Sequence, residues 1–247
     1  MSSDSGTFWD HLDALRTSLM RMLLAVALLA VAAFVMKDWL FSVVLAPRSS
    51  DFITYRLLGT ETFQLHLMNT GLTEQFMVHI RTAMYAGLLL ASPYIIYEAF
   101  RFVSPALYRN ERRYAVWIVG AAYVMFILGT IVNYFVVFPL TVRFLGTYQV
   151  SADVDNMLTL QSYIDTLLSM SLVMGVVFEL PVVSALMGRM GLINASTMSD
   201  YRRHALVAIL IVAAIITPTA DAFTLFVVAL PIYLLYEMSI LVVAVSH

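Results

Sequence analysis

Long apolar segments separated by short polar ones run along nearly the whole chain. A transmembrane helix needs roughly 20 apolar residues to cross about 30 Å of hydrocarbon. The pattern therefore predicts an all-α, polytopic membrane protein with six transmembrane helices, forming a single transmembrane domain over residues 1–247. The predicted spans lie at about 18–40, 76–97, 114–142, 162–187, 205–216 and 223–243.

The last two spans are expected to be short and to form a hairpin. Ala205–Ile216 and Phe223–Tyr236 each fall short of a full crossing, and a turn containing Pro218 joins them. Proline lacks an amide hydrogen and disfavours helix in the residue before it, so the chain turns there. Asp221 is expected to cap or anchor this turn, and the sequence leaves open whether the second arm continues past Glu237.

Composition supports a membrane protein and excludes several kinds of site. Hydrophobic residues make up 61% of the chain and charged residues 12%, against about 25% charged in a typical soluble domain. The chain has no cysteine, which excludes disulfides, thiolate metal sites and cysteine nucleophiles. Serine-hydrolase, zinc-protease and phosphate-loop motifs are also missing from the sequence, which predicts no enzyme activity, no cofactor and no metal. No basic run indicates nucleic acid as a partner.

Basic residues in the connections between spans predict the orientation. With an even number of spans, both termini lie on one side of the bilayer. That side carries Arg16, Arg21, Arg101, Arg109, Arg112, Arg113, Arg189, Arg202 and Arg203, while the other carries Lys37, Arg48, Arg56, Arg81 and Arg143. The excess places both termini in the cytoplasm by the positive-inside rule. The long outer connection, about 37–75, is expected to form short helices or turns on the membrane surface.

The connection after the second span is the richest candidate site. Between Tyr97 and Arg113 it contains carboxylates, aromatic rings and four arginines. A carboxylate accepts a guanidinium group through two parallel hydrogen bonds, and aromatic faces stack against it. The segment therefore suits an arginine-bearing ligand. The alternative is a solvated loop whose arginines only set the topology.

The N-terminal segment is amphipathic at helical spacing, with Phe8, Leu12 and Leu15 on one face. We expect it to lie on the cytoplasmic membrane surface beside the loop after the second span. The alternative is a simple interfacial anchor.

Glu179 is the strongest single-residue signal inside a span. An ionisable group there costs roughly 2.5–3.5 kcal/mol on insertion scales, so it should face a polar cavity or a partner, or be protonated. Pro181 removes a backbone hydrogen bond and is expected to kink the helix beside it. The alternative is a structural hydrogen bond to a neighbouring helix. Glu237 is similar but nearer the end of its span.

Several ordered motifs resemble the TatC family, the large subunits of the twin-arginine translocase. The matching residues are Phe8-x-x-His11-Leu12-x-x-Leu15-Arg16, Phe102-Val103-Ser104-Pro105-Ala106-Leu107-Tyr108 with Glu111-Arg112-Arg113, Tyr134–Pro139, Phe178–Pro181, Thr217-Pro218-x-x-Asp221, Pro231 and Tyr236-Glu237. They cover nearly the whole chain.

The resemblance implies a bacterial inner-membrane receptor with six helices in a glove-like, concave bundle. It implies binding of signal peptides that carry two consecutive arginines, through Glu111 and Phe102, with Arg16 and His11 contributing and Pro105 and Tyr108 in the same loop. It also implies self-association in a multimeric receptor complex and export of folded proteins driven by the proton-motive force. Glu179 matches a buried glutamate that contacts the single-span partners TatA and TatB, and Glu237 and Asp221 are the other intramembrane polar candidates.

One position departs from the family pattern. The family often carries glutamate immediately before the Leu15-Arg16 pair, where this chain has Ala14. Asp13 stands one residue earlier, which on a helix turns the carboxylate by about 100°. The amino-terminal half of the expected site therefore differs from the family pattern.

Two other functions fit the same residues. A proton-coupled secondary transporter of a small solute would use Glu179 as its proton or substrate site. A membrane scaffold or insertase would bind helices without selecting for paired arginines.

Overall fold

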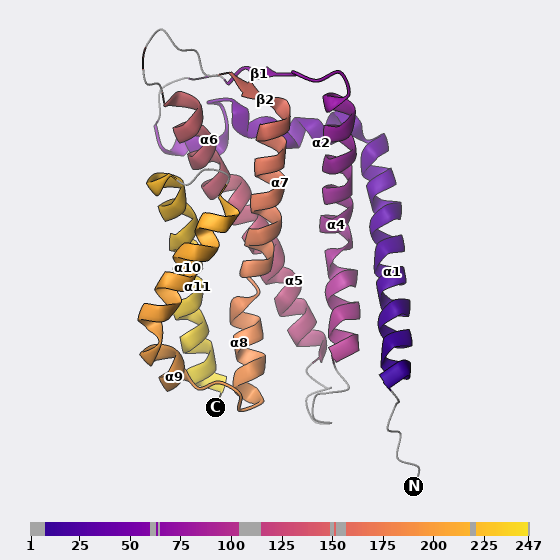
Figure 1. The fold of residues 1–247 in the computed structure, drawn as a ribbon, viewed down its shortest axis with the longest axis vertical. Coiled ribbons are helices and arrows are strands. Elements are labelled where there is room, and N and C mark those ends of the chain that lie inside the picture. The colour runs from indigo at the N-terminus through magenta and orange to yellow at the C-terminus, as the bar shows by residue number, and fades with distance from the viewer. Residues whose placement is uncertain are drawn as a thin grey trace. The chain divides into compact units, whose positions relative to one another are not determined.

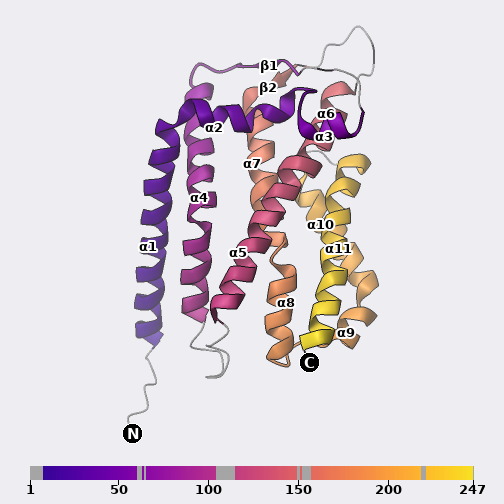
Figure 2. The same ribbon diagram turned by 180° about the vertical axis from the view of Figure 1, so that it is seen from behind.

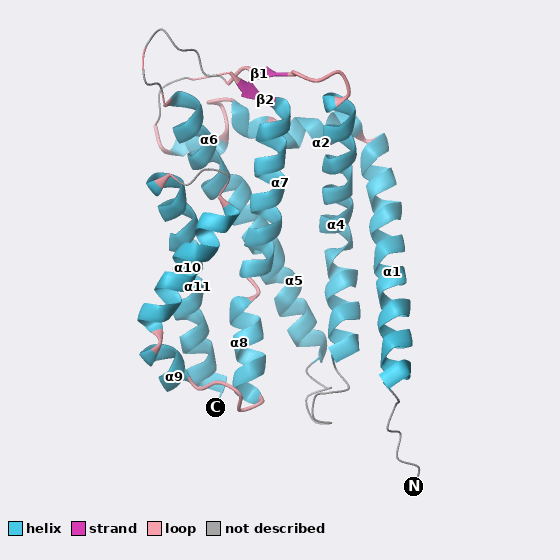
Figure 3. Ribbon diagram, viewed as in Figure 1, coloured by secondary structure: helices cyan, strands magenta, loops and turns pink. Residues whose placement is uncertain are grey.

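In a computed structural model the described residues are 8–59, 63, 65–103, 115–148, 151, 157–217 and 221–246, and their regular structure is almost entirely helical (Figures 1 and 3). The exceptions are β1 (Leu67–Met68) and β2 (Leu158–Thr159), which pair in parallel with Leu67 opposite Leu158. The prediction of an all-α protein is confirmed.

Five helical segments are long and apolar enough to cross a membrane. They are Leu12–Val35, Glu74–Phe102, Trp117–Thr147, Leu160–Arg189 and Ala222–Val245, and they overlap the first four predicted spans and the sixth. The helix at the fifth predicted span, α10 (Arg202–Ile216), has only 15 residues. The expectation that both last helices are short holds for α10 alone, because α11 (Ala222–Ser246) continues past Glu237 to a length of 25 residues. The apolar residues after Glu237 extend the second arm, and Pro231 does not interrupt it.

By its internal contacts the chain divides into two compact units. The first unit comprises Met1–Leu40 and His79–Tyr123, and the second comprises Phe41–Val78 and Val124–His247. Two helices, α4 (Glu74–Val103) and α5 (Ala115–Val132), contribute residues to both units.

The first unit is built on an antiparallel pair, α1 (Phe8–Val35) and α4, which lie side by side in Figures 1 and 2. At one end the ring of His79 stacks on Phe34 with centroids 3.9 Å apart, and its Nε2 lies 3.1 Å from the Phe34 carbonyl oxygen. In the middle, Gly87 allows close approach, since a β-carbon there would lie 2.6 Å from the backbone nitrogen of Ala30. The helix α1 begins well before residue 18, because the amphipathic N-terminal segment continues it.

The outer connection of the second unit contains the expected short helices. They are α2 (Lys37–Val44), which begins in the first unit, the 3-10 turn η1 (Ala46–Arg48) and α3 (Ile53–Leu57). The buried Tyr55 hydroxyl lies 3.0 Å from the Pro47 carbonyl oxygen and 2.9 Å from that of Pro139. Burial also raises the pKa of the Tyr55 phenol, so it stays protonated as a donor. Tyr55 therefore fastens α3 to both neighbouring segments.

The third span is interrupted by a π-helical turn. It consists of α5, η4 (Asn133–Val137) and α6 (Phe138–Thr147). Because Pro139 has no amide hydrogen, it cannot donate to the Phe135 carbonyl, and the Thr54 hydroxyl donates to that carbonyl instead. The buried Asn133 side chain turns to α7 (Leu160–Val177), where its Nδ2 donates to Ser171 Oγ at 2.7 Å.

Glu74, the first residue of α4, fastens the outer connection to α7. The carboxylate is buried, and its Oε2 accepts from the amides of Thr70 and Gly71, each at 2.9 Å, and from the Thr70 hydroxyl at 3.1 Å. Its Oε1 accepts from the amide of Gln161 at 3.0 Å. Glu74 therefore joins the beginning of α4 to a backbone amide that lies 87 residues further along the chain.

The contact between α5 and α7 depends on glycine. A β-carbon on Gly129 would lie 2.5 Å from the Met174 carbonyl oxygen and 2.8 Å from Phe178 Cβ, whereas one on Gly120 would meet nothing within 4 Å. We expect Gly129→Ala to lower the free energy of unfolding by about 2 kcal/mol, because the helices must separate. Gly120→Ala should be neutral or stabilising by up to about 1 kcal/mol, since alanine favours helix.

Denaturation of the two variants in detergent measures this difference on one helix. Equal stability of Gly129→Ala and Gly120→Ala would show that the close approach of α5 to α7 is wrongly placed.

The remaining helices pack around α11. The fourth predicted span is broken at Phe178 and Glu179, between α7 and α8 (Leu180–Arg189), where Figure 3 shows a loop. Pro181 cannot donate to the Val177 carbonyl, so the predicted kink is confirmed. The short helix α9 (Ala195–Asp200) is held by the Tyr236 hydroxyl, which donates to the Met198 carbonyl at 2.7 Å.

Candidate functional site

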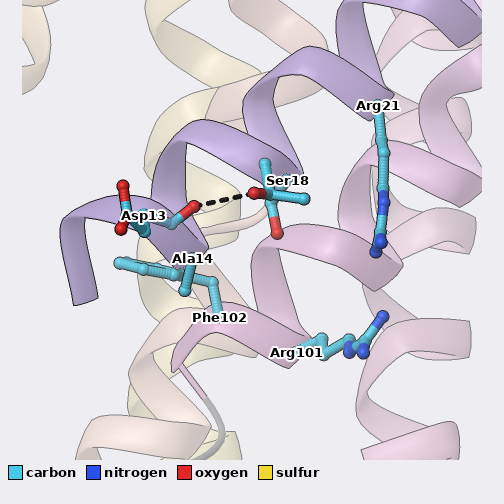
Figure 4. A pocket seen from close by; sticks show the side chains of 7 residues that line it. Asp13, Ala14, Ser18, Arg21, Arg101 and Phe102 are labelled. Carbon is cyan, nitrogen blue, oxygen red and sulfur yellow. Dashed lines mark hydrogen bonds between the residues drawn. The ribbon is translucent and has the colours of Figure 1, made fainter. Parts of the chain in front are cut away.

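A pocket of about 400 Å³ lies in the first unit, between the beginning of α1 and the end of α4 (Figure 4). Its lining residues are Asp13, Ala14, Thr17, Ser18, Arg21, Arg101 and Phe102. In Figure 4 the Phe102 ring lies beside Ala14, and the arginines approach each other on the other side of the pocket. The pocket therefore has an aromatic side with Asp13 and a cationic side.

The wall from α1 follows the helical repeat. Ala14 and Ser18 are four residues apart, as are Thr17 and Arg21, so all four lie on one side of the helix. Three of them are small, which lets α4 approach. The Thr17 hydroxyl donates to the backbone carbonyl of Asp13 at 2.8 Å, within the helix. This hydrogen bond does not involve the Asp13 carboxylate.

The carboxylate of Glu98, a residue only 2% exposed, contacts three of the lining residues, Ser18, Arg21 and Arg101. Its Oε2 accepts from the Ser18 hydroxyl at 3.1 Å, and its Oε1 accepts from the Tyr94 hydroxyl at 3.2 Å. The same Oε1 lies 3.9 Å from Arg21 Nη1 and 3.7 Å from Arg101 Nη1. These two separations exceed hydrogen-bonding distance, so the arginines pair with Glu98 through charge alone.

Of the residues expected to bind a signal peptide, the structure brings Phe102 to the pocket. Arg16 is exposed on α1 and borders a second, more open hollow of about 640 Å³ with Met20 and Leu24. His11 belongs to α1, but its side chain lies outside the described residues. Pro105, Tyr108 and Glu111 also lie outside the described residues, in the segment that follows α4. Their roles stay predictions.

The three intramembrane polar candidates lie in the second unit. Glu179 stands in the break between α7 and α8, and its buried Oε1 has no hydrogen-bond partner among the described residues. Glu237 is engaged, since its Oε2 accepts from Arg202 at 2.8 Å and its Oε1 accepts from the Tyr233 hydroxyl at 3.0 Å. Asp221 accepts from the amide of Thr224 at 2.7 Å. Asp221 therefore caps the beginning of α11, while the turn before it, residues 218–220, lies outside the described residues.

Sequence reasoning missed most of the pocket. It used Arg21 only as one of the basic residues that predict the orientation, and it did not separate Glu98 from the loop that follows. The spacing of Ala14, Thr17 and Ser18 on an otherwise apolar helix was an available signal, because small residues mark faces where helices approach. Within the described part of the chain, no group of three or more His, Cys, Asp or Glu could hold a metal ion.

Comparisons with known proteins identify the family. The model of the Sec-independent protein translocase protein (TatC) family matches residues 10–231. A Sec-independent protein translocase protein TatC from Deinococcus radiodurans is 35% identical, over 96% of this chain and 85% of that protein. One from Blattabacterium sp. is 32% identical, over 94% of this chain and 93% of that protein.

A solved structure agrees with these sequence matches. It is a crystal structure of the twin arginine translocase receptor TatC, with 28% identity and a TM-score of 0.79 over 96% of this chain and 99% of that one. A second crystal structure of the same receptor, in the detergent DDM, gives a TM-score of 0.78 at 28% identity, over 94% of this chain and 98% of that one. The chain therefore belongs to the TatC family of Sec-independent protein translocase proteins, and it is a multi-pass membrane protein of the protein-transport machinery.

Proposed function

We propose that this protein is the receptor subunit of a twin-arginine translocation system in a bacterial inner membrane, with both termini in the cytoplasm. It binds signal peptides that carry two consecutive arginines and, with single-span partners of the TatA and TatB type, exports folded proteins. The proton-motive force drives the transport. The observation that carries the proposal is the pocket at the end of α4, where Phe102 and Asp13 lie together in a chain of the TatC family.

The pocket and the segment after it supply the chemistry that paired arginines need. Glu111 follows α4 by a few residues and accepts one guanidinium group through two parallel hydrogen bonds. Phe102, 39% exposed, offers an aromatic face to the other, and Asp13 offers a carboxylate on the same side of the pocket. Lysine lacks the planar fork, so a lysine pair loses these paired hydrogen bonds.

Glu179 supports a contact with a partner helix. Its Oε1 is buried without a hydrogen-bond partner among the described residues, and an unsatisfied polar atom inside a membrane is costly. A polar side chain from a single-span partner would satisfy it. Glu237 has no such unpartnered oxygen, because Arg202 donates to one of its carboxylate oxygens and Tyr233 to the other.

Export of a folded reporter tests the function. Cells that carry this chain as their only large subunit, with single-span partners, should export a reporter whose signal peptide has two arginines. The same reporter with two lysines should remain inside. Equal export of both reporters would contradict the receptor function. Solute uptake by the purified chain alone would instead favour the secondary transporter.

A further inference from the structure

Two arginines line the pocket that, together with the segment after α4, would bind the arginine pair of a signal peptide. Arg21 and Arg101 come from α1 and α4, and their side chains are 51% and 60% exposed. Both guanidinium groups lie within 4 Å of the same oxygen, Glu98 Oε1, and like charges near one another repel. A pocket carrying two uncompensated guanidinium groups would therefore reject a ligand with two positive charges.

The Glu98 carboxylate compensates the charge of these arginines. A single oxygen, Oε1, lies within 4 Å of both guanidinium groups, while hydroxyls of Ser18 and Tyr94 hold the carboxylate in place. Together with Asp13, the pocket region then holds two carboxylates and two guanidinium groups among its described residues. The charges balance before a ligand enters.

Glu98, which belongs to α4, also connects the two walls of the pocket, because its hydrogen-bond partner Ser18 lines the pocket from α1. On α4, Phe102 is four residues beyond Glu98. On α1, Ala14 is four residues before Ser18, the residue that donates to Glu98. Residues four apart occupy the same face of a helix. The contact between Ser18 and Glu98 thus sets how closely the two walls of the pocket approach.

From this geometry we propose that Glu98 is a positioning residue of the signal-peptide site, which neutralises Arg21 and Arg101 so that the pocket admits a dicationic peptide. This inference rests on the proposed function. It assigns the balance of charge in the pocket to a residue that sequence analysis placed among the general features of the loop. In this chain Ala14 supplies no carboxylate to the pocket, so neutralisation falls to Glu98 and Asp13.

The decisive variant is Glu98→Gln, because glutamine removes the charge and keeps the shape. Its amide can accept from or donate to both hydroxyls, so the contacts with Ser18 and Tyr94 survive. We expect a labelled twin-arginine peptide to bind the purified variant about tenfold more weakly at low salt, with a smaller loss at high salt. The double variant Glu98→Gln/Arg101→Gln should restore affinity, because it removes the uncompensated cation.

A purely structural role for Glu98 predicts the opposite for the double variant, which would bind no better than Glu98→Gln. Arg101→Gln alone should bind the peptide more tightly than the wild-type chain, which tests the inference even if Glu98→Gln fails to fold. Asp200→Asn, an equal charge change on the exposed end of α9, should leave binding unchanged.

The outcomes separate the inference from the proposed function. If the wild-type chain binds twin-arginine and twin-lysine peptides alike, the proposed function fails. If the wild-type chain selects the twin-arginine peptide, either of two results would show that the role of Glu98 is wrong, and the receptor function would stand. In the first, Glu98→Gln binds that peptide with normal affinity, and in the second, the added Arg101→Gln substitution fails to restore affinity.

Discussion

We expect replacement of Glu111 by alanine to abolish export of a twin-arginine reporter, and replacement by glutamine to lower export at least about tenfold. A hydrogen bond to a charged group contributes roughly 1.5–3 kcal/mol, and a carboxylate makes two of them to one guanidinium group. Glutamine keeps the size of the side chain but loses the charge and one acceptor. Reporter activity outside the cytoplasm, normalised to the amount of receptor in the membrane, measures the effect.

The matched control for Glu111 is Asp200→Ala, which removes a carboxylate from the exposed end of α9. It should export the reporter as the wild-type chain does. Full export by both Glu111 variants would remove this residue from the binding site and would shift the proposal to the pocket formed by α1 and α4.

Glu74→Ala should give the largest loss of stability among single substitutions in the outer segments. The variant leaves the amides of Thr70, Gly71 and Gln161 without the carboxylate that they donate to. Buried donors without an acceptor are costly. We expect the midpoint of thermal unfolding in detergent to fall by roughly 5 °C or more, and the pairing of β1 with β2 to weaken.

Two further variants make the Glu74 measurement specific. Asp51→Ala removes an exposed carboxylate from the same outer connection and should change the midpoint by little. The unfolding midpoint of Glu74→Gln should lie close to that of Glu74→Ala. The glutamine NH2 group is itself a donor, so it cannot accept a hydrogen bond from a backbone amide. A midpoint for Glu74→Ala equal to that of Asp51→Ala would show that the carboxylate does not fasten these segments.

The length of the apolar segments made the spans predictable, because every helix that crosses a bilayer needs about the same number of apolar residues. Proline made the break before α8 predictable in the same way, since a missing amide hydrogen is a local property. The early start of α1 was not evident from apolar length, because a helix continues through an amphipathic segment that hydropathy alone counts as polar.

The contacts that build the pocket and fasten the outer segments could not be predicted. Ser18 and Glu98 are 80 residues apart, and Glu74 and Gln161 are 87 residues apart. Each residue alone is compatible with an exposed position near the end of a helix. Only the packing of one helix against another shows that these carboxylates are buried and which donors they engage.

The most direct test of the receptor assignment is crosslinking from inside the pocket. A photoreactive phenylalanine analogue replaces Phe102, and in a control chain it replaces Phe226, which is exposed on α11. A labelled signal peptide with two arginines should crosslink from position 102 at least about tenfold more than its two-lysine counterpart, and neither should crosslink from position 226. Equal crosslinking of the two peptides from position 102 would contradict recognition of paired arginines at this site.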